Sequence, residues 1–259
     1  MSARPSNGIR LAKLLAQRGV AARRKAEELI AEGAVTVNGI VAEVVTFVDP
    51  DRDVILVRGK PLPGTQGKAY YLMYKPAGYI TSRGELRGRK SVIELCGHLP
   101  VRVEPVGRLD VDTEGALLLT NDGHLAHALT HPSVGAPKRY LARVIGVPDE
   151  AALHAIATGV PLEDGVTAPA KARVMGADRR GNAQVEITVT EGRNRLVRRM
   201  MLKVGHPVLE LRRQSFAGLT LRGMELGEVR ELTAAEVQQI RAMAERKAPK
   251  PGRTPSPGM

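Results

Sequence analysis

The sequence predicts an α+β protein built from a small helical module and a larger sheet domain. Three observations support this prediction. The chain has 259 residues with 43% hydrophobic content, which is enough for one large or two modest cores. A stretch rich in proline and glycine, residues 59–68, has the composition of a linker. Beyond it, strand and helix patterns are mixed without the regular alternation of a doubly wound fold.

The N-terminal module is predicted to contain two helices followed by short strands. Helical spacing of leucine and alanine predicts helices over residues 10–17 and 23–31, with Gly33 ending the second. Alternating apolar residues over 35–41 surround an Asn-Gly hairpin signal, and 54–57 reads as a further strand.

This module is strongly basic. The first 26 residues contain seven lysines or arginines and no acid. Arg23 to Lys25 open a helix, where the helix dipole disfavours cations, so a bound anion is the natural compensation. We expect these side chains to contact RNA: Arg10, Lys13, Arg23, Arg24 and Lys25.

The larger domain is expected to start near residue 69. Strands are predicted at 70–74, 117–120, 140–144, 172–175 and 185–189, and helices at 123–129, 149–158, 194–204 and 234–246. The last helix opens with a capping box from Thr233 to Glu236. Residues 247–259 are basic and rich in proline, glycine and serine, and we expect a disordered tail.

Composition narrows the class of partner and compartment. The net charge of +12 and the pI of about 10.2 favour a polyanionic partner. The single cysteine, Cys96, excludes an internal disulfide and a cysteine-cluster zinc site, so we expect a cytoplasmic protein. No apolar run of about 18 residues occurs, which predicts no membrane insertion.

Three carboxylates lie together between two glycines in residues 107–115, just before an apolar strand. They belong to Asp110, Asp112 and Glu114. Like charges this close raise one another's pKa and repel, so a fold keeps them together only where cations or chemistry require it. The alternative is a solvated turn.

An arginine-rich helix offers the matching charge. Asn194 is a good helix N-cap, and Arg195, Arg198 and Arg199 then recur at helical spacing on one stripe. Facing the acidic cluster or a phosphate backbone, these guanidiniums become favourable neighbours. A plain arginine-rich surface is the competing interpretation.

Two further features are candidate substrate contacts. Tyr140 is one of the few aromatic residues in the chain, so its ring is a candidate for stacking on a single extruded base. Lys75 lies at a strand end before the turn Pro76-Ala77-Gly78, as a substrate-edge loop would require.

Five motifs in order resemble the RsuA/RluB family of ribosomal RNA pseudouridine synthases, with the wording of residues 159–165 and 191–195 closer to the large-subunit, RluB-like branch. They are Lys75–Gly78, residues 107–115, Thr120–Gly123, Lys138–Tyr140 and residues 191–200. Residues 9–66 likewise resemble an S4-like RNA-binding domain. The resemblance implies a catalytic domain over 69–246 with a mixed, largely antiparallel sheet and flanking helices.

The resemblance implies roles for individual residues. Asp110 becomes the catalytic aspartate, Tyr140 stacks on the flipped uracil and takes part in proton transfer, and Arg198 forms an ion pair with Asp110. Arg108 matches the residue that enters the space left by the base. The remaining expected RNA contacts of this domain are Lys75, Arg193, Arg195 and Arg199.

The predicted function is therefore site-specific isomerisation of uridine to pseudouridine in ribosomal RNA, with large-subunit (23S) RNA favoured. We expect no metal and no small-molecule cofactor, and a monomer whose partner is ribosomal RNA or a ribosome assembly intermediate. The same reaction on small-subunit RNA, and a non-catalytic RNA-binding or ribosome-assembly role, are the alternatives. Glycoside hydrolysis by paired Asp110 and Glu114 is disfavoured, because sugar sites use aromatic platforms.

Overall fold

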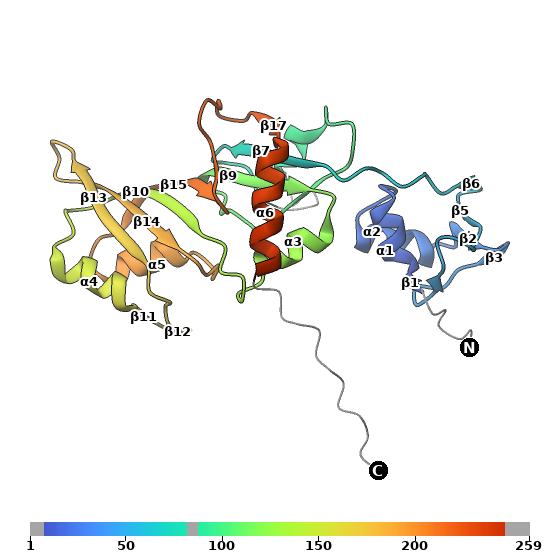
Figure 1. The fold of residues 1–259 in the computed structure, drawn as a ribbon, viewed down its shortest axis with the longest axis horizontal. Helices are drawn as coiled ribbons and strands as arrows, with labels where there is room; N and C mark the ends of the chain where they lie inside the picture. The colour runs from blue at the N-terminus through green and yellow to red at the C-terminus, as the bar shows by residue number, and fades with distance from the viewer. Residues whose placement is uncertain (1–7, 82–87, 247–259) are drawn as a thin grey trace, which may run out of the picture. The chain divides into compact units, whose positions relative to one another are not determined.

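The computed structural model describes residues 8–81 and 88–246 (Figure 1). The expected disordered tail at 247–259 lies outside these residues. The chain divides into two compact units, one reaching to Lys68 and including Pro100–Arg102, the other formed by the rest. In the described residues, no helix is both long and apolar enough to cross a bilayer.

The first unit contains the two predicted helices, α1 (Leu11–Gln17) and α2 (Arg23–Ala31). They pack over short strands through a core that includes Leu11, Leu15, Ile30 and Val35. The predicted hairpin joins β2 (Val35–Val37) to β3 (Ile40–Val41), and both of its turn residues have positive φ. The other strands are β1 (Ile9–Arg10), β4 (Phe47–Val48), β5 (Ile55–Val57) and β6 (Lys60–Pro61).

The second unit is built on a nine-stranded sheet with the main order β13-β14-β10-β15-β9-β7-β17. Every pairing is antiparallel except the one between β15 and β9, so the prediction of a mixed, largely antiparallel sheet is confirmed. The strands of the main path are β7 (Tyr70–Lys75), β9 (Thr113–Thr120), β10 (Lys138–Val144), β13 (Lys171–Ala177), β14 (Ala183–Val189), β15 (Val208–Phe216) and β17 (Val229–Glu231).

Helices flank this sheet, as predicted. The core places α3 (Gly123–Thr130) and α6 (Ala234–Arg246) against alternate residues of β7 and β9. Helices α4 (Glu150–Thr158) and α5 (Leu196–Lys203) lie near β13, β10 and β15 (Figure 1). The predicted capping box is present at α6, since Thr233 and Glu236 exchange backbone-to-side-chain hydrogen bonds.

Small elements complete the unit. Strands β8 (Glu104–Pro105) and β16 (Leu219–Thr220) are two residues long; β8 pairs with β9, and β16 pairs with β15. The hairpin of β11 (Pro161–Leu162) and β12 (Gly165–Val166) stands apart from the main sheet, and η1 (Glu94–Cys96) is a single 3-10 turn.

Strand β15 was absent from the sequence-based prediction, although it lies in the middle of the sheet. Its buried side contains Leu211, Arg213 and Ser215, so two of three inward positions are polar. A period of two in hydrophobicity cannot reveal such a strand. The sequence pattern therefore fails at the strand that carries a buried arginine.

Candidate active site

A cavity of about 250 Å³ in the second unit collects most of the predicted site residues. Its lining includes Asp110 and Arg108 from the loop before β9, Tyr140 from β10, and Arg193 and Arg195 from the segment before α5. Residues separated by more than 80 positions in sequence thus share one hollow. The remaining predicted residues of this unit, Lys75, Arg198 and Arg199, do not line it.

Lys75 is hydrogen-bonded to the backbone of the acidic loop that contains Asp110. Its ammonium donates hydrogen bonds to the carbonyls of Pro76, Asp110 and Thr113 at 3.0, 3.1 and 2.9 Å. The side chain is fully buried, and this burial lowers the pKa of Lys75 to about 8. In this structure Lys75 is not available to RNA as the sequence analysis expected, because its ammonium is bonded to the backbone that carries Asp110.

The two charge clusters meet, but with other partners than predicted. Arg198 lies 3.1 Å from the carboxylate of Asp112 and donates to the Asp112 and Val208 carbonyls. In the described residues, the arginine that lies within ion-pair distance of Asp110 is Arg195, at 3.8 Å, and it also lies 3.3 Å from Asp112. The predicted Asp110–Arg198 ion pair is thus replaced by a clamp of Arg198 on the neighbouring aspartate.

The start of helix α5 also differs from the prediction. Its N-cap is Arg195 in the left-handed region, with φ of 47°, rather than Asn194. This conformation swings Arg195 towards the acidic loop, while Leu196 and Val197 remain buried. The sequence pattern places Arg195 inside the helix, whereas in the structure it caps the helix and lines the cavity.

Arg199 points away from the acidic loop. Its guanidinium makes two hydrogen bonds of 2.9 and 3.0 Å to the carboxylate of Asp164, between β11 and β12. Arg193 donates to the carbonyls of Asp164 and Gly165 in the same hairpin. The expected common stripe of three guanidiniums therefore splits, because Arg195 and Arg198 reach the acidic loop and Arg199 holds the hairpin.

The wall of the cavity around Tyr140 contains residues that the sequence analysis did not select. Lys138 donates to the carbonyls of Ala136 and Thr190, and burial together with the charge of Arg213 lowers its pKa to about 8. Lys138 and Arg213 both lie over the ring of Phe216, at 5.7 and 5.0 Å from its centroid. Only contacts between strands distant in sequence bring these groups together.

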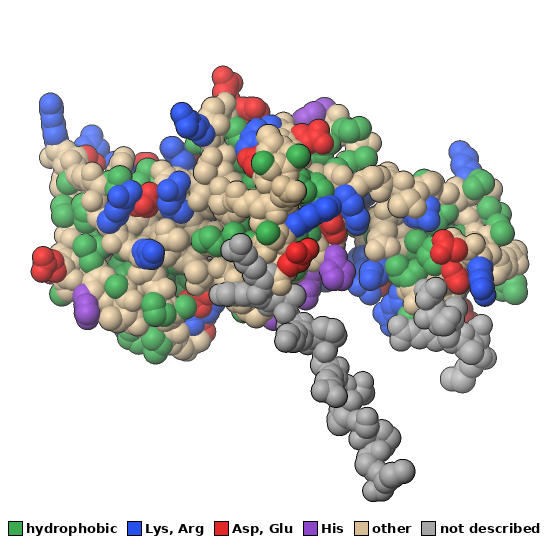
Figure 2. Space-filling model, in the orientation of Figure 1, with side chains coloured by type: hydrophobic (Ala, Val, Ile, Leu, Met, Phe, Trp, Pro, Cys, Tyr) green, Lys and Arg blue, Asp and Glu red, His purple; other side chains and the backbone are tan. Residues whose placement is uncertain are grey.

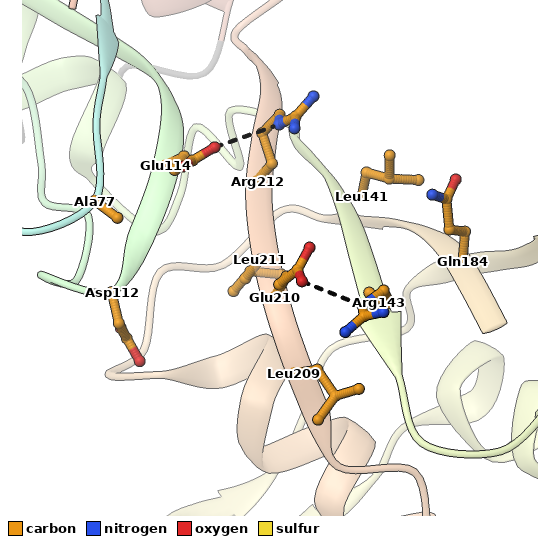
Figure 3. A pocket seen from close by; sticks show the side chains of 10 residues that line it. All are labelled: Ala77, Asp112, Glu114, Leu141, Arg143, Gln184, Leu209, Glu210, Leu211 and Arg212. Carbon is orange, nitrogen blue, oxygen red and sulfur yellow. Dashed lines mark ion pairs between the residues drawn. The ribbon is translucent and has the colours of Figure 1, made fainter. Parts of the chain in front are cut away.

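A second cavity of about 270 Å³ lies on the other face of the sheet (Figure 3). Neighbouring residues of one strand line different cavities, since Leu141 and Arg212 line this one while Tyr140 and Arg213 line the other; Leu211 contributes to both. Glu114 lies here, 3.6 Å from Arg212. Asp110 and Glu114 thus serve different cavities, which removes the paired-carboxylate arrangement that glycoside hydrolysis needs.

This second face carries balanced charge. Arg143 lies 3.2 Å from Glu210 (Figure 3), and Arg173 and Arg139 both lie within 4 Å of Glu186. Figure 2 shows that Lys and Arg side chains also lie beside Asp and Glu side chains on the face of the larger unit that is in view. Such pairing leaves little free positive charge for an anion, in contrast to the first cavity.

The five basic residues predicted for the N-terminal module are all exposed: Arg10, Lys13, Arg23, Arg24 and Lys25. Arg10 stacks over Phe47, while Lys25 and Arg23 lie 2.7 and 3.9 Å from glutamates on their own helix. These surface pairs are weak and can be exchanged for phosphate contacts.

Two family models match the chain. The model described as RNA pseudouridylate synthase matches residues 69–203, and the S4 domain model matches residues 9–54. The first match contains Asp110, Tyr140 and Arg198, and the second contains the five exposed cations.

Known proteins similar over nearly the whole chain carry the same description. Ribosomal large subunit pseudouridine synthase B of Bacillus subtilis is 45% identical over 91% of this chain and 97% of its own length. A protein of Aquifex aeolicus described as an uncharacterized RNA pseudouridine synthase is 43% identical over 90% of this chain and 93% of its own length. A crystal structure of a pseudouridylate synthase superposes with a TM-score of 0.65 at 28% identity, covering 90% of this chain and 99% of that one.

Proposed function

The chain belongs to the RNA pseudouridylate synthase family and is an RNA pseudouridine synthase, and from this premise we propose that it acts on a uridine of large-subunit ribosomal RNA with Asp110 as its catalytic carboxylate. The substrate assignment follows the name of the Bacillus subtilis relative, a ribosomal large subunit pseudouridine synthase. The residue assignment is supported by one observation above all. Asp110 and Tyr140 line the same cavity together with arginines 108, 193 and 195.

The reaction requires a base that has left its stack. The bond between N1 and C1′ of the uridine breaks, a bond between C5 and C1′ forms, the proton on C5 is lost and N1 gains one. Because no atom is gained or lost overall, a carboxylate and a proton-transferring hydroxyl suffice as reacting groups. Extrusion of the base costs a few kcal/mol, which contacts to the surrounding RNA backbone can supply.

Each group has a place in this scheme. The carboxylate of Asp110 starts the isomerisation, and the ring of Tyr140 stacks on the extruded uracil. Arg108, Arg193 and Arg195 hold the phosphates beside the extruded nucleotide, since guanidiniums bind phosphate in a fixed two-pronged geometry. Arg198 supports the site from behind through Asp112.

We also propose a division of labour between two domains. Residues 9–66 form an S4-type RNA-binding domain that gives affinity through exposed cations, and residues 69–246 form the catalytic domain. Ribosomal RNA, free or in an assembling particle, is the partner.

The decisive experiment is substitution of Asp110 by asparagine, which preserves shape and removes the charge. We expect no pseudouridine in large-subunit RNA incubated with Asp110→Asn, while RNA affinity stays within about tenfold, or about 1.4 kcal/mol. Glu210→Gln is the matched control, because this carboxylate lies on the opposite face of the sheet. It should retain wild-type activity.

Pseudouridine mapping on both ribosomal RNAs completes the test. Pseudouridine formed by the Asp110→Asn protein would reject the catalytic assignment. Modification of small-subunit RNA alone by the wild-type protein would reject the substrate assignment and leave the catalytic one intact.

A further inference from the structure

Arg213 occupies an unusual position beneath the cavity of Asp110 and Tyr140. It lies on β15 directly opposite Tyr140 on β10 and opposite Gly115 on β9. Its side chain is only 2% exposed, yet it contributes to the lining of this cavity. The guanidinium is therefore a buried charge at the floor of the site.

This charge is poorly compensated. Its Nε donates 2.8 Å to the carbonyl of Ala116, but its Nη2 is buried without a hydrogen-bond partner. Among the residues that the structure describes, no carboxylate lies within 4.0 Å of Arg213. A buried charge is costly unless it is paired. Other arginines of the described residues have a buried Nε without a partner, but Arg213 is the one whose terminal nitrogen is in this state. Its retention calls for a group that arrives from outside the protein.

Neighbouring cations strengthen the same local field. Lys75 and Lys138 are also largely buried close by, and the charge of Arg213 contributes to lowering the pKa of each. Burial and the charge of Arg213 lower the pKa of Lys138, and Glu191 is the acid that acts against them. Arg213 and Lys138 thus place two largely buried cations beside this cavity, whereas the field at Lys75 is offset by the carboxylates of Asp112, Asp110 and Glu114.

We propose that Arg213 is a further functional residue of the reaction, whose buried charge stabilises the negative charge that develops on the uracil ring. This inference rests on the proposed function. When the N1–C1′ bond breaks, its electron pair stays on N1 and the ring is an anion until C5 bonds to C1′. If the Asp110 carboxylate instead adds to C6 of the ring, the electron pair of the C5–C6 double bond moves towards the carbonyl oxygen O4, so negative charge develops on the uracil by either route.

A fixed cation near such an anion is effective because it is already in place and sits in a dry environment. Water would have to reorient around the new charge, whereas Arg213 is held by the carbonyl of Ala116 and by the face of Phe216. The polar interior of β15, which concealed this strand from the sequence pattern, then has a function.

The test measures single-turnover conversion by the full-length protein of one RNA containing either uridine or 5-fluorouridine at the target position. Fluorine withdraws electrons and helps the ring to bear negative charge without the protein. We expect Arg213→Met to lower the rate on uridine by about 100-fold or more. The loss on 5-fluorouridine, followed as disappearance of that nucleoside, should be only about tenfold.

Three companion variants define the cause. Arg213→Lys keeps a charge and should recover at least about tenfold of the lost rate. Arg213→Gln keeps an N–H donor for Ala116 without the charge, and it should resemble Arg213→Met. Arg212→Met is the matched control on the same strand, because its side chain faces the second cavity; its rate should equal that of the wild type.

Several outcomes would overturn the inference. Equal losses on uridine and 5-fluorouridine would mean that Arg213 only shapes the site, and an unchanged rate would exclude any role. If both neutral variants fail to fold, Arg213→Lys decides, since equal losses on uridine and 5-fluorouridine in this variant would assign the guanidinium to the shape of the site. A wild-type protein that converts no uridine contradicts the proposed function instead, so the two failures are distinguishable.

Discussion

At the scale of single residues, the site depends on cationic side chains that donate their hydrogen bonds to the protein's own backbone carbonyls. Lys75 is the clearest case, since its three hydrogen bonds hold the turn that presents Asp110. Burial of this ammonium costs free energy, and the pKa of about 8 records that cost. The lysine belongs to the support of the catalytic loop rather than to the RNA surface.

This position predicts a specific pH dependence of stability. The pKa of Lys75 lies near 10.5 in the unfolded chain and near 8 in the folded one, so between these values the unfolded state binds more protons. The free energy of unfolding should therefore rise with pH over this window, by up to about 1.4 kcal/mol per unit. Denaturant unfolding of wild type and Lys75→Met at pH 7.5 to 10 measures the contribution as the difference between the two proteins.

Lys75→Met should also be about 2 kcal/mol less stable at neutral pH, because the carbonyls of Asp110 and Thr113 lose their donor. Lys138, whose pKa is also near 8, is present in both proteins and cancels in the difference. Parallel pH profiles for the two proteins would contradict the assignment to Lys75.

The chemistry of individual residues was accessible from the sequence only in part. The acidic cluster and the scarce aromatic Tyr140 stand out in a basic chain, but only the family motif selects Asp110 among the three carboxylates of the cluster. The burial of Lys75 could not be predicted, since a lysine before a Pro-Ala-Gly turn gives no sign of three carbonyls converging on it. Arg213 could not be selected for a related reason, because the groups around it, Tyr140 and the carbonyl of Ala116, come from strands distant in sequence.

At the scale of elements, helix α5 acts as a clamp on the acidic loop. Arg198 joins the helix to Asp112 and to the first residue of β15, and its side chain is only 12% exposed. The helix itself was predictable from the spacing of its apolar residues. Its partner carboxylate was not, because Asp110 and Asp112 differ by two positions in one loop and only the backbone path decides between them.

A double-mutant cycle tests this clamp. We expect Arg198→Met to reduce isomerisation strongly and to cost only about 1 kcal/mol of stability, because Asp112 is half exposed and keeps Arg195 as a partner. Asp112→Asn should cause a similar defect, and the double variant should be no worse than Arg198→Met alone. Losses that multiply in the double variant would show that Arg198 acts independently of Asp112.

The same scale explains which strands the sequence could predict. Buried residues alternate regularly in β14, where Ala183, Val185, Ile187 and Val189 face inwards. In β15 the inward positions include Arg213 and Ser215, and the pattern disappears. Prediction fails where a strand carries polar side chains inwards, which is also where the cavity lies.

At the scale of the whole molecule, the excess of positive charge has two destinations. Part of it lies buried under the catalytic cavity, and part is exposed on the N-terminal module. The order of the two domains and the mixed sheet could be predicted from composition, linker and family motifs. Strand order could not, since it depends on pairings between segments as distant as β7 and β17.

The exposed charge predicts a measurable salt dependence. We expect the double variant Lys13→Gln and Arg24→Gln to bind RNA less tightly and to reduce the slope of log affinity against log salt by about 1.5, for two lost phosphate contacts. The isomerisation rate at saturating RNA should not change. Arg52→Gln, an exposed cation elsewhere in the module, is the control. If Arg52→Gln lowers the salt slope by as much per removed charge as the double variant does, the RNA is attracted by net charge rather than bound at a defined surface.

The pairing of β15 with β9 is the one parallel pairing in the sheet and spans only three residue pairs. Asp110 precedes β9 on one side of this seam, whereas Tyr140 and Arg213 belong to the other. On each side of this seam the strands pair antiparallel. The distance between the carboxylate of Asp110 and the ring of Tyr140 is therefore set across three residue pairs, so a substitution that shifts this short seam would change the spacing of the reacting groups while leaving the antiparallel pairings on either side in place.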